Sequence, residues 1–286
     1  MPFVDSGGVR LAYEEAGRGY PVVFVHEFAG DLESWEPQLA HFARRYRCVA
    51  FNARGYPPSD VPSDPDAYSQ EAAVNDIGAV MDQLDLARAH VVGLSMGAFA
   101  ALHFALRFPE RTSAVVLAGI GYGALEAQQE QFRREVGESA DRFEAAGMAE
   151  SAAGYAATPH RAAFRRKDPR GFDEFERGLA AHSTDGSVGT LRGVQRDRPP
   201  LDTLPGLDGL STPALIVAGD EDEPSLAPSL YLQRTLPNAA LSILPRTGHT
   251  INLEEPATFN ALVEEFLAAV DGGRWETGEG PSGRIL

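Results

Sequence analysis

The chain has 286 residues, a length that suits one large α/β domain with an insertion and can bury a full hydrophobic core. Its formal net charge of −16 argues against a nucleic-acid-binding surface, because surfaces that follow phosphates are basic. The single cysteine, Cys48, excludes an intrachain disulfide, and neither a membrane span nor a signal peptide is evident, so we expect a cytoplasmic protein.

The first half of the sequence alternates short apolar runs with helical patterns, which is typical of a parallel sheet with crossover helices. Apolar residues at helical spacing predict a helix within residues 72–86, and an alanine-rich run predicts another over about 96–108, ended by Pro109. The predicted strands are residues 22–25, 48–51, 90–92 and 114–117. The fold class predicted is therefore α/β.

From about residue 123 to residue 200 the strand signal disappears, and the composition becomes charged and rich in alanine. Phe132, Val136 and Phe143 lie on one helical stripe there, which predicts helices with one apolar face. Such helices cannot bury that face alone, so we predict a helical cap on the sheet domain.

The strand and helix pattern resumes at residues 214–217 and 241–244 and closes with a helix that contains residues 259–266. The predicted organisation is a core formed by residues 1–122 and 201–271, a cap of residues 123–200 and a polar, glycine-containing tail over residues 272–286.

A candidate nucleophile stands between the strand at residues 90–92 and the helix that follows it. Residues 93–97 read Gly-Leu-Ser-Met-Gly, which matches the Gly-x-Ser-x-Gly turn that exposes a serine hydroxyl above a sheet. The same motif also occurs in ordinary strand-to-helix turns. Because a strand precedes it and a helix begins at Met96, we predict that Ser95 is a nucleophile.

A candidate base and a candidate acid follow the later strands. His249 lies on the loop after the last predicted strand, where its imidazole could take the proton of Ser95 and return it to the leaving group. Residues 220–222 read Asp-Glu-Asp after the preceding strand, and one of these carboxylates should orient the imidazole. The chain order serine, acid, histidine is the order that α/β-hydrolases use.

These motifs resemble the α/β-hydrolase superfamily, in the capped subgroup of enol-lactonases, perhydrolases and ring-cleavage-product hydrolases. The resemblance covers nearly the whole chain: residues 23–26, residues 52–60, the serine turn, residues 219–222 and Gly248-His249. It implies a mostly parallel sheet flanked by helices, with an inserted helical cap.

The resemblance also implies roles for particular residues. The acid of the subgroup usually stands three residues after a glycine, which favours Asp222 and leaves Asp220 and Glu221 as alternatives. The oxyanion hole is expected to consist of the backbone N–H groups of Met96 and Phe28.

Glu27 departs from the pattern, since relatives commonly have glycine after the strand-end histidine. If its side chain entered the site, an ionised carboxylate would oppose the developing oxyanion, whereas a neutral one could donate a hydrogen bond. The alternative, which we favour from sequence, is that Glu27 faces away and pairs with an arginine such as Arg54.

The predicted activity is hydrolysis of a small-molecule carboxylic ester or lactone without a cofactor or metal. A C–C bond hydrolase or a perhydrolase on the same residues, and a ligand-binding receptor with little turnover, are the alternatives. Serine at the turn argues against haloalkane dehalogenase and epoxide hydrolase chemistry, whose relatives place aspartate there.

Substrate-pocket residues are expected to include Glu27, Phe132, Phe143 and Phe164. The expected partner is a small-molecule substrate, not nucleic acid or membrane, with a homodimer left open.

Overall fold

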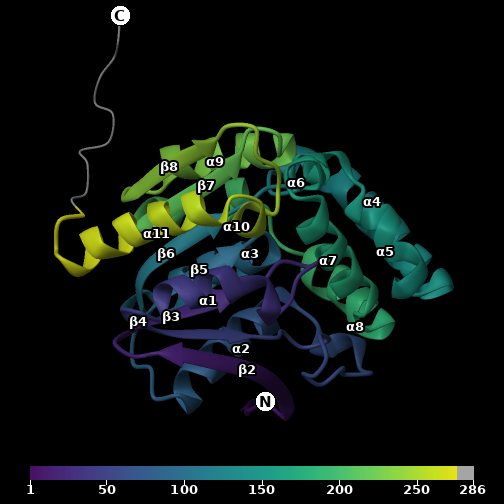
Figure 1. Cartoon of the computed structure of the whole chain (residues 1–286), viewed down its shortest axis with the longest axis horizontal. Helices are drawn as coiled ribbons and strands as arrows, with labels where there is room; N and C mark the ends of the chain where they lie inside the picture. Colours follow the sequence, from purple (N-terminus) through teal and green to yellow (C-terminus); the bar gives the residue numbers. More distant parts are fainter. Residues whose placement is uncertain (276–286) are drawn as a thin grey trace, which may run out of the picture.

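The computed structural model describes residues 1–275 and contains one twisted sheet of eight strands in the order β1-β2-β4-β3-β5-β6-β7-β8 (Figure 1). The strands are β1 (Phe3–Ser6), β2 (Val9–Gly17), β3 (Tyr20–Val25), β4 (Tyr46–Phe51), β5 (Ala89–Leu94), β6 (Thr112–Ala118), β7 (Ala214–Gly219) and β8 (Ala239–Leu244). The strands β3 to β8 are parallel, whereas β2 pairs antiparallel with both β1 and β4.

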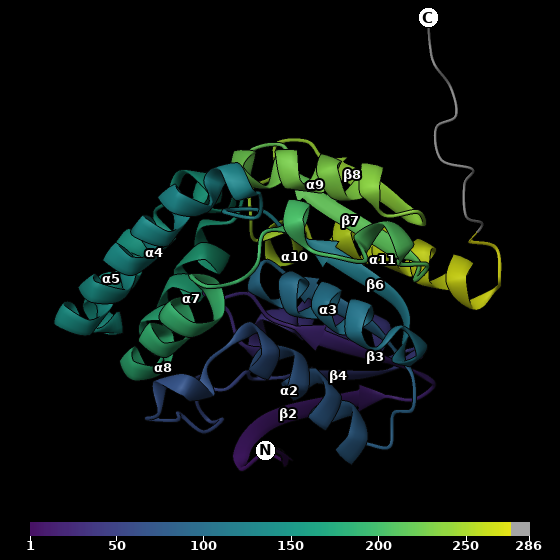
Figure 2. The same ribbon diagram turned by 180° about the vertical axis from the view of Figure 1, so that it is seen from behind.

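Helices cover both faces of the sheet, with α1 and α11 on the face toward the viewer in Figure 1 and α2, α3 and α9 on the face seen in Figure 2. The helices are α1 (Glu36–Phe42), α2 (Gln70–Gln83), α3 (Met96–Arg107), α4 (Glu126–Ala146), α5 (Met148–Ala156), α6 (Ala162–Lys167), α7 (Pro169–Ala180), α8 (Thr184–Gly189), α9 (Glu223–Thr235), α10 (Ile251–Glu254) and α11 (Pro256–Asp271). Short helical turns include η4 (Pro159–Arg161) and a π-helix, η5 (Thr190–Gln195).

Two hydrophobic layers hold this arrangement together. One contains Ile77 of α2 and Phe104 of α3 against alternate residues of the strands, and the other contains Trp35 before α1 and Phe259 of α11. The central strands are apolar on both sides because each face is covered by helices.

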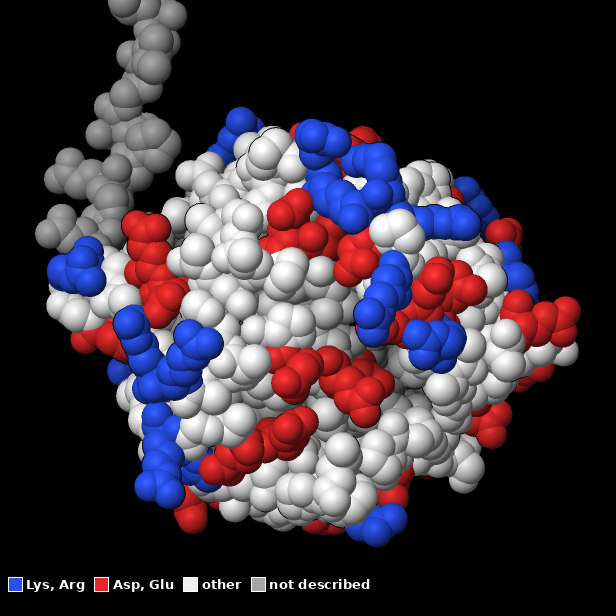
Figure 3. Space-filling model, viewed as in Figure 1, with Lys and Arg blue, Asp and Glu red and all other residues white. Residues whose placement is uncertain are grey.

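The chain between β6 and β7 forms a helical insertion, α4 to α8, which lies at the carboxyl end of the parallel strands (Figures 1 and 2). A third apolar cluster packs it on the core, and ion pairs at α6 add to this contact. Arg166 pairs with Glu221 at 2.7 Å, and Lys167 pairs with Glu254 at 2.9 Å. Figure 3 shows basic side chains next to acidic ones over this region.

The predicted α/β fold is confirmed, and each predicted strand is present with one or two further residues at its ends. The hairpin β1–β2 and the helices α1 and α9 were not predicted. In the described residues, no helix is both long enough and apolar enough to span a membrane. Of the predicted tail, residues 276–286 lie outside the described residues.

Candidate active site

Ser95 stands on the turn between β5 and α3 in a strained backbone conformation, with φ 53° and ψ −113°. A serine rarely adopts a positive φ, so the surrounding packing must impose it. The two glycines of the motif make the turn possible. A Cβ at Gly97 would collide with the Val25 carbonyl oxygen, and a Cβ at Gly93 would collide with the backbone of Gly97. The turn leaves the Ser95 side chain at the wall of a cavity.

His249 and Asp222 form a buried hydrogen-bonded pair at the ends of two neighbouring strands, with 2.7 Å between Nδ1 of His249 and Oδ2 of Asp222. The Ser225 hydroxyl donates a second hydrogen bond to the same carboxylate oxygen. Burial by itself raises the pKa of Asp222, but His249 and the Ser225 hydrogen bond outweigh burial and lower it. Asp222 is therefore held as an acceptor, which fixes the proton of the imidazole on Nδ1 and leaves Nε2 without it.

The other two carboxylates of this turn have separate contacts. Oδ1 of Asp220 accepts a hydrogen bond from the Thr247 backbone N–H at 3.1 Å, and Glu221 pairs with Arg166 of α6. Neither is bonded to His249 in the described residues. Of the three carboxylates, Asp222 is therefore the one that His249 contacts.

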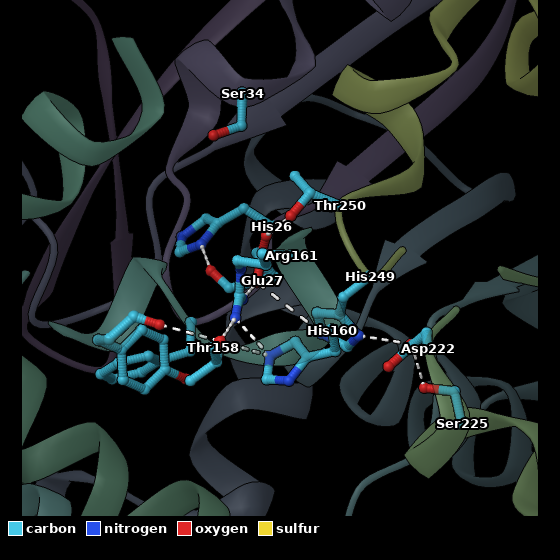
Figure 4. Close-up of polar contacts among 12 residues, drawn as sticks. His26, Glu27, Ser34, Thr158, His160, Arg161, Asp222, Ser225, His249 and Thr250 are labelled. Atoms are coloured by element: carbon cyan, nitrogen blue, oxygen red, sulfur yellow. Dashed lines mark hydrogen bonds and ion pairs between the residues drawn. The ribbon is translucent and has the colours of Figure 1, made fainter. Parts of the chain in front are cut away.

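The Glu27 carboxylate lies at the other side of His249, with 3.9 Å between Oε2 of Glu27 and Nε2 of His249 (Figure 4). Its side chain is 2 % exposed, and Oε2 accepts a hydrogen bond of 2.5 Å from Nη2 of Arg161. Glu27 pairs with an arginine, as favoured from sequence, but the partner is Arg161, whereas Arg54 pairs with Asp76. The expectation that Glu27 faces away is wrong, because its carboxylate lies beside His249. The arginine that Glu27 contacts comes from the insertion, and the pair lies beside the histidine.

His160 and Arg161 of η4 bring the insertion into contact with the His249 loop, and neither is among the site residues expected from sequence. The His249 backbone N–H donates to the His160 carbonyl at 2.8 Å, and the two imidazole rings meet edge to face with centroids 5.2 Å apart. Burial, with the nearby charge of Arg161, lowers the pKa of His160 to about 2, so this ring is neutral. The adjacent His160 and Arg161, after a proline, were the available sequence signal.

The two backbone amides expected to bind an oxyanion, those of Phe28 and Met96, donate no hydrogen bond within residues 1–275. Met96 is the first residue of α3, where a helix leaves its N–H groups free. The Tyr56 hydroxyl donates to the Phe28 carbonyl and so fixes the orientation of that peptide. Two unused donors near a serine could stabilise a developing negative charge.

A cavity of about 200 Å³ lies between the insertion and the sheet, lined by Ser95, Asp222 and His249. Among the predicted pocket residues, Phe132 lines this cavity, whereas Glu27, Phe143 and Phe164 do not. Phe143 stacks on Phe28 with the ring centroids 6.3 Å apart. Phe164 packs against Phe172 and Phe175 within the insertion and borders a different cavity.

Comparison with known proteins places this geometry in a family. The model of the alpha/beta hydrolase fold matches residues 20–256. A 3-oxoadipate enol-lactonase 2 from Acinetobacter baylyi is 27% identical over 247 residues, which are 86% of this chain and 88% of that protein. A solved hydrolase from Pseudomonas aeruginosa is 27% identical with a TM-score of 0.81, over 94% of this chain and 98% of the other. A solved N-acyl homoserine lactone degrading enzyme is 26% identical with a TM-score of 0.75, over 93% and 100%. With its sheet order, strained serine turn and matching family model, the chain belongs to the α/β-hydrolase fold family.

Proposed function

We propose that this protein is a serine hydrolase that cleaves a carboxylic ester or lactone of a small molecule. The observation that carries the proposal is the 2.7 Å hydrogen bond between His249 and Asp222, on the same cavity as a serine with positive φ. Relatives named as an enol-lactonase and as a lactone-degrading enzyme support the substrate class.

In the proposed reaction, Oγ of Ser95 attacks the carbonyl carbon while Nε2 of His249 takes the hydroxyl proton. The amides of Phe28 and Met96 would stabilise the tetrahedral oxyanion. The imidazolium, held by Asp222, returns the proton to the departing oxygen, and an acyl group remains on Ser95. A water molecule, deprotonated by His249, then releases the acid and restores the serine.

The insertion is proposed to act as a cap that closes this cavity. Tyr155 and Leu191 supply part of its wall, so the acyl or alcohol part of a substrate would contact the insertion. Bulk at these positions would then select substrates by size, while Ser95 and His249 carry the chemistry.

Labelling with a fluorophosphonate probe tests the nucleophile directly. We expect stoichiometric labelling of Ser95, detected by peptide mass spectrometry, and loss of labelling in Ser95→Ala. A screen of p-nitrophenyl esters of increasing acyl length and of simple lactones should then show turnover that Ser95→Ala lacks.

Each result of these experiments has a distinct meaning. Labelling without ester or lactone turnover would favour C–C bond cleavage or perhydrolysis on the same nucleophile. No labelling of the folded protein would contradict the proposal and favour a ligand-binding receptor.

A further inference from the structure

Arg198 is a buried cation that pairs with no carboxylate of residues 1–275, and it lines the cavity that contains Ser95. Its residue is 4 % exposed, and its Nε has no hydrogen-bond partner within residues 1–275. One guanidinium nitrogen, Nη2, donates to the Tyr122 carbonyl oxygen. Burying a guanidinium without an opposite charge is costly, so the group needs a compensating function.

The other buried arginines of the described chain do have carboxylate partners. Arg161 pairs with Glu27 at 2.5 Å, and the mostly buried Arg54 pairs with Asp76 at 2.5 Å. Arg198 has no such contact, and burial lowers its pKa to about 9, which still leaves it charged at neutral pH. Arg198 is therefore a buried positive charge that no carboxylate of residues 1–275 neutralises, at the wall of the candidate active site.

Aromatic rings hold the guanidinium in place in the wall of this cavity. The Cζ atom of Arg198 lies 3.8 Å from the ring centroid of Phe99 and 4.4 Å from that of Phe132. Phe99 is one helical turn after Ser95, and its N–H donates to the Ser95 carbonyl at 3.1 Å. Arg198 and Ser95 line the same cavity, so one ligand can contact both groups.

The acidic residues of the cavity wall are already engaged. Asp222 is bonded to His249, and Glu135 accepts hydrogen bonds from the Tyr122 hydroxyl and from Gln131. Neither forms an ion pair with Arg198 among the described residues. A ligand would therefore have to bring the missing negative charge.

We propose that Arg198 binds a carboxylate of the substrate, so that the preferred substrates are anionic: half-esters of small dicarboxylic acids, or lactones that carry a carboxylate. The inference rests on the proposed hydrolase function and deepens it. A guanidinium matches a carboxylate with two parallel hydrogen bonds, and the surrounding rings exclude the water that would screen the pair. Because Arg198 and Ser95 line one cavity of about 200 Å³, a small substrate can place its ester at Ser95 and its carboxylate at Arg198.

A pair of matched substrates tests the proposal. Monomethyl glutarate and methyl pentanoate differ in having a carboxylate or a methyl group at the same position of the acyl chain, and proton release measures both hydrolyses. We expect wild type to favour the half-ester in kcat/KM. Arg198→Met should lower the ratio of the two kcat/KM values at least about 30-fold, since it removes the partner of a buried charge. Arg198→Lys should retain part of the preference.

Arg133→Met is the matched control, because Arg133 is an exposed arginine of α4 outside the cavity. The ratio of the two kcat/KM values in Arg133→Met should equal that of wild type. This control separates local binding of the carboxylate from the effect of a change in net charge. An unchanged ratio in Arg198→Met, or equal losses for both esters together with a lower Tm, would overturn the proposal. Equal losses would mean that Arg198 only anchors the Tyr122 loop.

A binding experiment keeps the inference independent of turnover. Titration calorimetry of Ser95→Ala with monomethyl glutarate should show binding that the Ser95→Ala/Arg198→Met variant loses. If the fluorophosphonate probe does not label Ser95 and wild type hydrolyses neither ester, while this difference in binding is present, the hydrolase proposal fails and the carboxylate site stands. If hydrolysis occurs but the binding difference is absent, the hydrolase proposal stands and the carboxylate site fails.

Discussion

The Glu27 carboxylate on the core and the Arg161 guanidinium on the insertion form a salt bridge of 2.5 Å in which both side chains are almost fully buried. Glu27 takes a position where relatives of the subgroup commonly have glycine, and Arg161 fills the space opposite it. Thr250 also approaches Glu27, with 3.4 Å between its hydroxyl and Oε1. The pair joins the loop after β3, the insertion and the residue after His249.

Breaking this pair should destabilise the protein more than removal of a surface pair. Glu27→Ala leaves Arg161 buried without its carboxylate, so we expect a loss of about 3–5 kcal/mol in the free energy of unfolding, measured by urea titration. The double variant Glu27→Gly/Arg161→Leu should recover much of it, because both charges are gone. The exposed pair of Arg170 and Glu174 is the control, and Glu174→Gln should cost about 0.5 kcal/mol or less. A loss below about 1 kcal/mol for Glu27→Ala would contradict the prediction.

The three carboxylates after β7 should differ sharply in kinetics. Asp222→Asn should lower kcat by several orders of magnitude, because His249 would lose the acceptor that fixes its tautomer. Glu221→Gln should leave kcat nearly unchanged, since the Glu221 carboxylate pairs with Arg166 of α6. Asp220→Asn should affect stability through the Thr247 amide more than kcat. Steady-state kinetics on one ester decide the matter, and a severe kcat loss confined to Asp220→Asn would reassign the acid.

Two phenylalanines of the insertion should have different effects on specificity. Phe132 lines the cavity, so Phe132→Leu should change the relative kcat/KM for short and long acyl groups by several-fold. Phe164 packs inside the insertion, so Phe164→Leu should lower Tm and leave the acyl preference unaltered. If both variants shifted the acyl preference equally, specificity would depend on the packing of the whole insertion and not on the residues that line the cavity.

Acid should destabilise the protein through its buried histidines. Burial lowers the pKa of His103 to about 4, so the folded protein keeps this ring neutral while the unfolded chain, with a pKa near 6.5, binds a proton. The stability from the neutral ring is complete above pH 6.5 and is lost as the pH falls toward 4. Between pH 7.5 and pH 5.5, His103→Asn should lose about 1.4 kcal/mol less of its unfolding free energy than wild type. Urea titrations at the two pH values measure both losses. If wild type and His103→Asn lost the same amount of unfolding free energy, the prediction would be contradicted.

The strands β3, β5, β6 and β7 could be predicted from sequence because they are buried on both faces and therefore appear as unbroken apolar runs. The hairpin β1–β2 was missed because it contains no unbroken apolar run, since exposed charged residues such as Arg10 and Glu14 interrupt it. In α9, Pro224 and Pro228 concealed a helix of thirteen residues. Pro224 stands in the first turn, where a missing N–H costs nothing.

The position of a residue in the fold decides whether its part in the candidate site could be predicted. Ser95, Asp222 and His249 each follow a strand of the parallel sheet, and the strand ends bring them to one edge. Arg161 and Arg198 belong to the helical insertion, where spacing shows which residues share a face but not which part of the core that face meets. Their partners, Glu27 and the rings of Phe99 and Phe132, are far away in sequence, so only the folded structure brings them together.

The hydrogen bond from the His249 amide to the His160 carbonyl has a consequence for redesign of this scaffold. A shortened chain in which a linker replaces the insertion would lose that bond, and it would leave Glu27 without Arg161. Such a truncation would therefore disturb the histidine itself, beyond enlarging the space above it. Variants intended for bulkier substrates should keep residues 158–161 and instead diversify the wall that α4 and the π-helix η5 contribute.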